Sequence, residues 1–236
     1  MKIEVLADAQ GAARRAAEVI AADAATAVAM RGRFVAAVSG GSTPWAMLRA
    51  LAVLDVPWAA THLIQVDERI APAGSAERNI THIEESLLAQ APLARGQVHA
   101  MPVEVADPDA AAAVYAETLR RYAGSPPVFD LVHLGLGADG HTASLVPGDT
   151  VLDATDDVAL AGPYQGVRRM TLTYPTLDRA RRILWLVTGA EKAPMLARLV
   201  AGDRSIPAGR VRQDHALLIA DAAAATGIDD GDANGQ

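Results

Sequence analysis

Short apolar runs alternate with longer helical patterns along almost the whole chain, and this alternation restricts the fold more than any other feature of the sequence. The apolar runs, such as FVAAV and ILWLV, are nearly continuous and do not alternate with polar residues. Strands of that kind are buried on both faces, as happens when helices cover both sides of a parallel sheet. The sequence therefore predicts an α/β fold with an open, mostly parallel sheet and helices on both faces.

The residue pattern also places the individual elements. Apolar, often β-branched runs predict strands at residues 2–6, 33–38, 61–66, 97–101, 129–134, 158–161, 169–173, 183–187 and 216–219. Helical composition or spacing predicts helices at residues 9–30, 44–54, 77–89, 107–122, 175–181 and 190–200. In a parallel sheet of this kind, ligands bind in loops that follow the carboxyl ends of the strands. Three such loops contain residues suited to chemistry.

Composition excludes several classes of protein. The chain has 236 residues, enough for one sizeable core, and shows no interdomain linker. We therefore expect a single domain over residues 1–225, followed at 226–236 by an acidic, apolar-poor tail that is expected to be disordered. The absence of cysteine excludes disulfides, thiolate metal sites and cysteine nucleophiles.

Charge and hydropathy restrict the partners and the location. The formal net charge of −7 argues against nucleic acid or an anionic membrane as the main partner. No apolar run approaches the roughly 20 residues that span a bilayer, and the first residues lack an apolar signal core, so we expect a cytoplasmic protein. An anionic ligand would need a local basic pocket. The chain has 19 arginines and two lysines, Lys2 and Lys192, which draws attention to Lys192.

The first of the three loops is SGGSTP, between the strand at 33–38 and the helix at 44–54. Gly40 and Gly41 allow the backbone to approach an anion closely, and the free N–H groups of the following helix favour phosphate. Ser42 and Thr43 are able to donate hydroxyls to such a ligand. An ordinary capped turn explains the same residues equally well. The segment is not a Walker loop, because no Gly-Lys-Ser/Thr follows.

The second loop places three charged residues, Asp67, Glu68 and Arg69, directly after the strand at 61–66. Arg69 is suited to binding a phosphate through its planar guanidinium. The two carboxylates are suited to orienting that arginine or to contacting sugar hydroxyls. Taken alone, the cluster is also compatible with a solvated loop.

The third loop is GLGADGHTAS, after the strand at 129–134. It contains G-x-G-x-x-G, the dinucleotide-binding fingerprint, but that motif belongs to the first βαβ unit of a domain and here lies past the middle of the chain. A turn that presents Asp139 and His141 at the end of a strand is the better interpretation. Histidine is the natural general base near neutral pH, and a neighbouring carboxylate orients it.

Other catalytic motifs are absent from the sequence. There is no G-x-S-x-G of serine hydrolases and no H-E-x-x-H of metalloproteases. Asp139-x-His141 and His82-x-x-Glu85 have metal-like spacing but no evident third ligand, so no metal site is predicted. The remaining histidines are interpreted as structural or surface residues: His62, His82, His99, His133 and His215.

Taken together, these segments resemble the 6-phosphogluconolactonase family. The resemblance extends from about residue 3 to residue 225 and depends on motifs that occur in the family's order: SGGSTP at 39–44, DER at 67–69 with Arg78-Asn79 after it, GLGADGHTASLVPG at 135–148, MTLTYP at 170–175 and TGAEKA at 188–193. Each motif is modestly specific, but their combination is strongly specific.

The resemblance implies a single Rossmann-like α/β domain related to glucosamine-6-phosphate deaminases and ribose-5-phosphate isomerases. It also implies hydrolysis of 6-phospho-D-glucono-1,5-lactone to 6-phospho-D-gluconate, a step of the oxidative pentose phosphate pathway, without a metal or other cofactor. By similarity, His141 is the general base that activates water, with Asp67 and Asp139 also in the catalytic site. The residues expected to bind the substrate and its phosphate are Gly40, Gly41, Ser42, Thr43, Arg69, Asn79, Lys192 and Arg169.

Two departures from the family pattern affect the expected contacts. A lysine–proline cluster often precedes the TLT strand in the family, but here the stretch reads GPYQGVRR, with Arg168 and Arg169 as the candidate replacements. Arg78 stands where many members have serine.

Two alternatives remain. A deaminase acting on an amino sugar phosphate typically has a glutamate five residues after the histidine, where this chain has Val146. A non-catalytic sugar-phosphate sensor usually carries a helix-turn-helix domain, for which this chain has no room. We therefore expect the partner to be a small sugar phosphate, and the protein to be a monomer or weak homodimer.

Overall fold

A sheet of seven parallel strands forms the centre of the protein, which the computed structural model describes over residues 1–228. The strand order is β1-β10-β9-β6-β2-β3-β5. The bounds are β1 Lys2–Leu6, β2 Phe34–Val38, β3 Thr61–Gln65, β5 Val98–His99, β6 Leu131–Leu134, β9 Ile183–Val187 and β10 Ala216–Asp221. From β2 the chain adds β3 and β5 on one side, then returns to place β6 on the other, so the topological switch point lies between β2 and β6.

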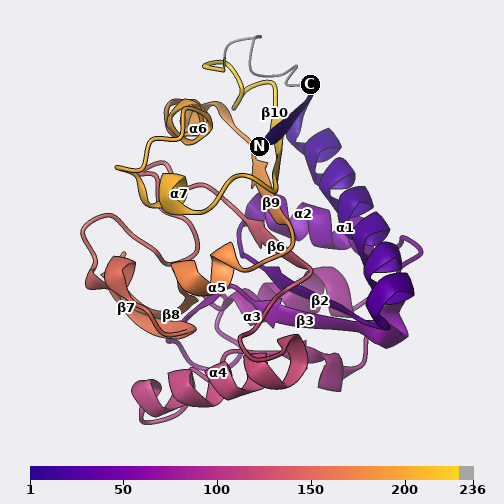
Figure 1. Cartoon of the computed structure of the whole chain (residues 1–236), viewed down its shortest axis with the longest axis vertical. Coiled ribbons are helices and arrows are strands. Elements are labelled where there is room, and N and C mark those ends of the chain that lie inside the picture. The colour runs from indigo at the N-terminus through magenta and orange to yellow at the C-terminus, as the bar shows by residue number, and fades with distance from the viewer. Residues whose placement is uncertain (229–236) are drawn as a thin grey trace.

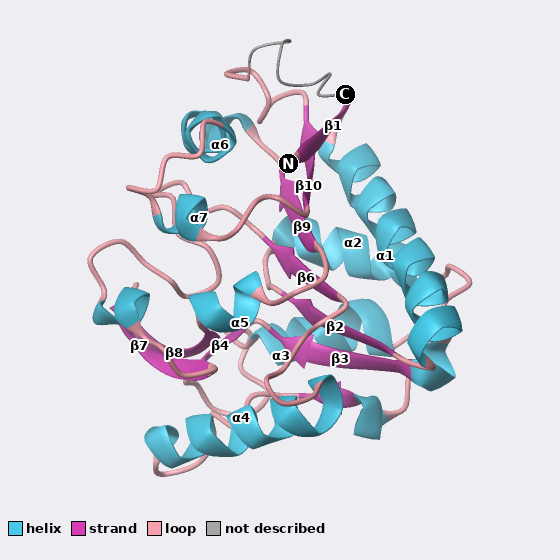
Figure 2. Ribbon diagram, viewed as in Figure 1, coloured by secondary structure: helices cyan, strands magenta, loops and turns pink. Residues whose placement is uncertain are grey.

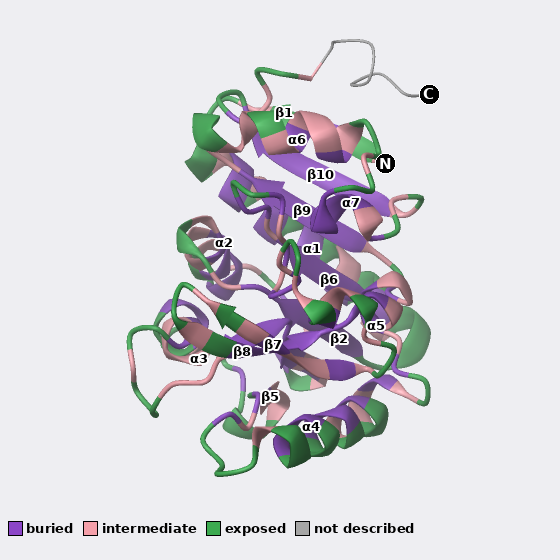
Figure 3. Ribbon diagram, turned by 90° about the vertical axis from the view of Figure 1, so that its left-hand side faces the viewer, coloured by how far each residue is buried: buried purple, intermediate pink, exposed green. Residues whose placement is uncertain are grey.

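Helices cover both faces of this sheet, as predicted (Figure 1). On one face lie α1 Ala9–Arg31, α2 Ser42–Ala52 and α3 Asn79–Ile83. The other face is covered by α4 Pro108–Ala123, α5 Tyr174–Asp178, α6 Ala193–Val200 and α7 Pro207–Arg210. The inner strands β2, β6, β9 and β10 are buried along their whole length, whereas α4 is buried only on the side that faces the sheet (Figure 3).

The two-residue period of the strands divides the core into two layers. In β2, Phe34, Ala36 and Val38 pack toward α1 and α2, whereas Val35 and Ala37 face the opposite layer. On its sheet-facing side α1 buries mostly alanines, whose small side chains allow close approach: Ala12, Ala13, Ala16, Ala17, Ala24 and Ala27. Asp8 caps its first turn by accepting from the N–H of Gly11, and Gly32, in the left-handed conformation, ends it.

A second sheet, antiparallel and three-stranded, lies beside the first (Figure 2). It consists of β4 Asp67–Arg69, β8 Val167–Leu172 and β7 Val158–Tyr164. The strands predicted at 158–161 and 169–173 therefore exist, but they belong to this antiparallel sheet and not to the parallel one. The three charged residues expected to form a loop are β4, which pairs with β8. Because all three residues are charged, no apolar run indicates this strand.

Several predicted elements have different bounds. The helix expected at 77–89 is α3 followed by a π-helical turn, Glu84–Leu88, and the helix expected at 190–200 begins with a 3₁₀ turn, Ala190–Lys192, before α6. The predicted tail falls mainly on residues 229–236, which lie outside the described residues. Among the described residues, no helix combines the length and apolar character that crossing a membrane requires.

Candidate active site

A cleft of about 260 Å³ lies at the carboxyl ends of β2, β3 and β6, where the sheet has its switch point. The three loops selected from the sequence meet there. All but one of the predicted site residues line this cleft: Gly40, Gly41, Ser42, Thr43, Asp67, Arg69, Asn79, His141, Arg169 and Lys192. The exception is Asp139, which contacts the cleft through His141.

The glycine loop leaves the start of α2 open toward the cleft. Gly41 precedes the helix with φ +129°, a conformation that favours glycine, and no side chain caps this helix. Ser42 and Thr43 therefore carry first-turn N–H groups that are available to an anion. Gly40 packs against Asn79 so closely that a Cβ there would lie 2.0 Å from the Asn79 Oδ1. Glycine is required at both positions, for different reasons.

A buried histidine of the neighbouring strand β6 holds the start of this loop through hydrogen bonds to Ser39. The Nδ1 of His133, on β6, accepts a hydrogen bond from the Ser39 N–H at 3.3 Å, and the Ser39 Oγ donates to the His133 carbonyl at 3.0 Å. Complete burial lowers the pKa of His133 to about 3, so the ring is neutral. Ser39 is thus engaged with the sheet, and the structural role predicted for His133 agrees with this geometry.

The loop is also tied to the strand on its other side. The hydroxyls of Thr43 and Thr188, the residue after β9, lie 2.6 Å apart. Lys192 lies in the 3₁₀ turn that follows, Ala190–Lys192, and its side chain reaches the cleft. The loops after β2 and β9 therefore approach the same cleft from two sides.

Two arginines lie opposite each other on adjacent strands of the second sheet. Arg69 of β4 is the direct cross-strand partner of Arg169 of β8. Like charges at such a position are destabilising unless an anion lies between them. Burial, together with the charge of Arg69, lowers the pKa of Arg169, although a guanidinium stays charged at neutral pH. The Arg169 Nε is buried and has no hydrogen-bond partner among the described residues.

Asn79 orients Arg69 toward the cleft. The Arg69 Nη1 donates to the Asn79 Oδ1 at 2.6 Å and to the Glu77 carbonyl at 3.1 Å. The Asn79 Nδ2 in turn donates to the Asp67 carbonyl at 2.9 Å. Both polar groups of the Asn79 side chain therefore form hydrogen bonds within the protein. These bonds hold Arg69 in place at the cleft.

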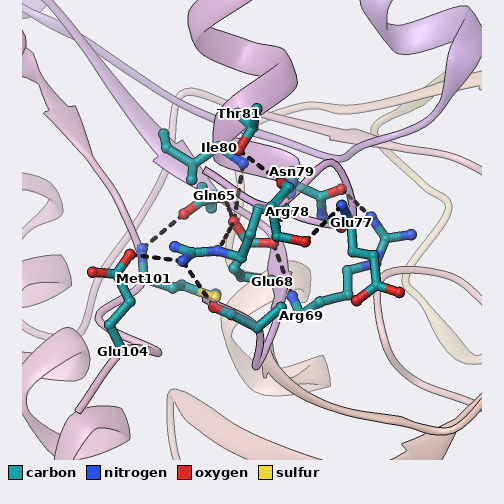
Figure 4. Close-up of polar contacts among 12 residues, drawn as sticks. Gln65, Glu68, Arg69, Glu77, Arg78, Asn79, Ile80, Thr81, Met101 and Glu104 are labelled. Carbon is teal, nitrogen blue, oxygen red and sulfur yellow. Dashed lines mark hydrogen bonds and ion pairs between the residues drawn. The ribbon is translucent and has the colours of Figure 1, made fainter. Parts of the chain in front are cut away.

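Glu68, for which the sequence suggested orienting Arg69, contacting a sugar hydroxyl or a solvated position, is fully buried and organises this part of the site (Figure 4). One carboxylate oxygen accepts from the N–H groups of Arg69 and Asn79, at 2.8 and 2.7 Å. The other accepts from the N–H of Ile80 and the side chain of Gln65, both at 2.9 Å. A carboxylate at the start of α3 satisfies its free N–H groups and fixes Arg69 next to it.

Arg78, the departure from the family's serine, neutralises this buried carboxylate. Its Nε lies 3.1 Å from the Glu68 Oε2, an ion pair without hydrogen-bond geometry, and its Nη1 donates to Glu104 at 2.7 Å. Arg78 is 2% exposed and does not line the cleft. Arg78 thus connects Glu68 to Glu104 in a charge network outside the cleft.

His141 and Asp139 form a hydrogen-bonded pair at the end of β6. The His141 Nδ1 lies 2.5 Å from the Asp139 Oδ1, which also accepts from the His141 N–H at 3.1 Å. Burial alone would raise the pKa of Asp139, but hydrogen bonds from His141 and Tyr164 outweigh it and lower that pKa. An ionised Asp139 requires a proton on Nδ1, so Nε2 of the neutral ring carries the lone pair, as a general base requires.

The glycines of this segment serve the histidine and not a nucleotide. A Cβ at Gly137 would lie 2.0 Å from the His141 Nδ1 and 2.6 Å from the Asp139 Oδ1. Gly140 has φ +84° and abuts Ile206. The dinucleotide-like spacing therefore arises from a tight turn that brings Asp139 and His141 together.

Asp67 has a buried partner that sequence reasoning did not single out. The Ser144 Oγ donates to the Asp67 Oδ2 at 2.6 Å, and both residues are nearly inaccessible to solvent. This bond joins the DER segment to the loop of His141. The position of Ser144 within the GHTAS motif marks it as a candidate, but its bond to Asp67, 77 residues away, depends on the tertiary structure.

The other sequence candidates lie apart from the cleft. Arg168 is exposed and does not line it, so of the two candidate replacements only Arg169 does. His62 and His99 contact each other, with the Nδ1 of one 3.1 Å from the Nε2 of the other, and His82 pairs with Glu85. Within residues 1–228, no three histidine or acidic side chains gather as a metal site would require.

Comparisons with known proteins identify the family. The chain matches the family model of glucosamine-6-phosphate isomerases/6-phosphogluconolactonase over residues 7–220. A 6-phosphogluconolactonase of Synechocystis sp. is 35% identical over 204 residues, covering 85% of this chain and 85% of the relative. A 6-phosphogluconolactonase of Nostoc sp. is 33% identical over 230 residues, covering 94% of this chain and 96% of the relative.

Solved structures show the same fold. A 6-phosphogluconolactonase from Thermotoga maritima is similar with a TM-score of 0.83 at 27% identity, covering 93% of this chain and 98% of that one. A monomeric glucosamine-6-phosphate deaminase has a TM-score of 0.83 at 18% identity, over 96% and 100% of the two chains, which confirms the predicted fold relationship to glucosamine-6-phosphate deaminases. By the family model that matches most of its length and by these relatives, this chain belongs to the glucosamine-6-phosphate isomerase/6-phosphogluconolactonase family.

Proposed function

We propose that this protein hydrolyses 6-phospho-D-glucono-1,5-lactone to 6-phospho-D-gluconate, a step of the oxidative pentose phosphate pathway. The observation that carries the proposal is one cleft that holds both the base of the His141–Asp139 pair and three positive charges, Arg69, Arg169 and Lys192, for which residues 1–228 provide no ion pair. Such a cleft suits a small ligand with a phosphate at one end and a reactive carbonyl at the other. The Synechocystis, Nostoc and Thermotoga maritima relatives are each named 6-phosphogluconolactonase, the enzyme of this reaction.

The phosphate is proposed to bind between Arg69 and Arg169. The two guanidinium groups repel each other as cross-strand neighbours, and a dianion bound between them would replace this repulsion with two attractive contacts. The phosphate would also give the buried Nε of Arg169 a hydrogen-bond acceptor. Lys192 and the open N–H groups at the start of α2 complete the binding site. Because the phosphate is remote from the reacting carbon, its binding chiefly orients the lactone.

The reaction is proposed to begin with general-base catalysis by His141. Its Nε2 takes a proton from water while the water oxygen forms a bond to C1 of the lactone, and the carbonyl oxygen becomes an oxyanion. Collapse of this intermediate breaks the bond between C1 and the ring oxygen. The imidazolium returns its proton to that oxygen, and the product is the open carboxylate after loss of the acid proton to solvent. Asp139 stabilises the imidazolium throughout.

The rival deaminase activity finds less support in this cleft. Val146, at the position where deaminases typically have a glutamate, does not line the cleft. Asp67 is the one carboxylate among the lining residues of the described chain, and it is held by Ser144. Hydrolysis of a lactone requires one base and a group that holds the lactone in position. His141 is suited to the first role, and the cationic side chains of the cleft are suited to the second. We also propose that the protein acts in the cytoplasm, as a monomer or weak homodimer, on this small molecule.

The decisive experiment measures lactone disappearance with purified protein. Glucose-6-phosphate dehydrogenase generates the lactone, and its decay is compared with the spontaneous rate. We expect acceleration by the wild type, and a loss of roughly 10²–10⁴-fold in His141→Ala, the usual contribution of a general base. His215→Ala is the matched control, because His215 forms a similar pair with Asp214, at 2.7 Å, away from the cleft.

An absence of acceleration by the wild type would refute the proposed function. Full activity in His141→Ala would refute the mechanism. Ammonia release from glucosamine 6-phosphate is the corresponding assay for the deaminase alternative.

A further inference from the structure

Tyr164, a residue to which the sequence gave no role, contacts both ends of the proposed site. Its hydroxyl donates to the Asp139 Oδ2 at 3.1 Å, and its ring centroid lies 5.1 Å from that of His141. The guanidinium carbon of Arg169 lies 5.0 Å from the centroid of the same ring. A single side chain thus touches the carboxylate that orients the base and the arginine that faces the phosphate.

We infer that Tyr164 is a positioning residue that fixes the His141–Asp139 pair through its hydroxyl and Arg169 through its ring. This inference rests on the proposed function. It concerns a residue in the stretch GPYQGVRR, where the chain departs from the lysine–proline pattern of the family.

The hydroxyl fixes the plane of the Asp139 carboxylate. One oxygen of that carboxylate faces the His141 Nδ1, and the other accepts from Tyr164, so rotation of the group would break both bonds. Burial and the negative charge of Asp139 raise the pKa of Tyr164, which keeps its proton available for donation. By donating a hydrogen bond to Asp139, the hydroxyl stabilises the negative charge of this carboxylate. The carboxylate therefore stabilises the imidazolium form of His141 less strongly than it would without Tyr164.

The ring gives Arg169 a surface to pack on. Arg169 is 5% exposed, is repelled by Arg69 opposite, and leaves its Nε without a partner in the described part of the chain. A guanidinium over an aromatic face gains cation–π attraction and keeps its hydrogen-bond donors free. Packing on Tyr164 therefore holds the charge in the cleft without consuming the groups that would bind phosphate.

The backbone makes this placement rigid. Tyr164 ends β7 and pairs with Val167 across a two-residue turn, in which Gln165 and Gly166 have φ of +53° and +81°. Positive φ at both positions is the signature of a type I′ hairpin, whose twist matches that of its strands. An irregularity in the pairing between Ala161 and Tyr164 turns the end of the strand toward Asp139.

Two substitutions separate the two contacts. Tyr164→Phe removes the hydroxyl and keeps the ring under Arg169, whereas Tyr164→Ala removes both. Tyr122→Phe is the control, because Tyr122 packs on His62 and His99 and does not line the cleft. Steady-state rates across pH are measured for each variant. The affinity for 6-phosphogluconate, the product, and for inorganic phosphate is measured by calorimetry.

For Tyr164→Phe we expect kcat to fall about 2- to 12-fold, as for the loss of one hydrogen bond, with KM and product affinity unchanged. The acidic limb of the kcat/KM profile should move to higher pH, because Asp139 then stabilises the imidazolium more strongly. The other charged groups of the cleft, Asp67, Arg69 and Lys192, are the same in all variants. Tyr164→Ala should show these changes together with a KM and a product dissociation constant about 2- to 30-fold higher.

The inference is overturned if Tyr164→Phe matches Tyr122→Phe in kcat and pH profile, or if Tyr164→Ala binds 6-phosphogluconate and phosphate as the wild type does. A merely structural role would lower the melting temperature and leave the pH profile in place, which also overturns it. A wild type without lactonase activity refutes the proposed function instead. In that case the phosphate affinities still decide whether the ring positions Arg169.

Discussion

A single methyl group added at Gly137 would test the active-site geometry directly. A Cβ at this position would lie 2.0 Å from the His141 Nδ1, 2.3 Å from its Cε1 and 2.6 Å from the Asp139 Oδ1. Gly137 is not among the residues with positive φ, so alanine is permitted by the backbone and excluded only by these contacts. Gly137→Ala therefore displaces the His141–Asp139 pair without a second cause of strain.

The expected loss follows from the displacement. Non-bonded heavy atoms in contact require a separation of about 3.5 Å, so a ring whose nearest atom would lie 2.0 Å away has to retreat by roughly 1.5 Å. A misplacement of about 1 Å at a reacting group costs on the order of 10²-fold in rate. We expect kcat to fall at least about 100-fold. KM should change little, because Arg69, Arg169 and Lys192 are untouched.

The lactone-decay assay measures this effect, with Gly96→Ala as the matched control. A Cβ at Gly96 meets nothing within 4 Å. The side chains of His141 and Asp139 are 23% and 37% exposed and are able to yield toward solvent. A destabilisation near 1 kcal/mol would lower Tm by only about 2–4 °C. If Gly137→Ala is well folded and retains activity within about threefold of the control, the arrangement of His141 and Asp139 described above is not the catalytic one.

Three further predictions concern the groups around this pair. Arg169→Met should raise KM about 10- to 100-fold through loss of a charge-assisted contact to phosphate, whereas Arg168→Met, at an exposed position outside the cleft, should leave KM unchanged; steady-state kinetics decide this. Glu68→Ala removes the buried partner of Arg78 and leaves it only the half-exposed Glu104. Breaking a buried pair costs about 3–5 kcal/mol, or roughly 6–20 °C in Tm by calorimetry. Urea unfolding of the wild type should show stability declining as the pH falls below about 6.5, because the pKa of His133 is about 3 when folded and near its ordinary value when unfolded, so the unfolded state binds the proton first. This residue alone accounts for about 2 kcal/mol between pH 6.5 and 5, and in His133→Asn that part of the decline should disappear.

Local sequence information was sufficient for the sheet and for the loops that carry the site. Strands such as β2 and β9 are apolar along their whole length because both faces are buried, and that property is visible in the residues themselves. The ends of such strands then identify the loops that meet at the switch point. Ten of the eleven predicted site residues line one cleft for this reason.

The second sheet was not predictable in the same way. β4 consists of three charged residues, and nothing in their sequence indicates pairing with β8. The strand forms because Val66 bonds to both sheets: its N–H donates to the carbonyl of Val38, and its carbonyl accepts from the N–H of Leu172. Glu68 shows the same limitation, because its sequence left three roles open and only the partners brought from α3 bury its carboxylate.

The sequence by itself determined the fold class, the family and the position of His141, because hydrophobic periodicity and short motifs are properties of neighbouring residues. Tertiary structure alone decided which distant side chains meet. The pairing of β4 with β8 places Arg69 opposite Arg169, and the hairpin between β7 and β8 brings Tyr164 to Asp139. These contacts depend on strand register and on the direction of a turn. Both are set by packing of the whole chain, and neither is encoded in the spacing of the residues that meet.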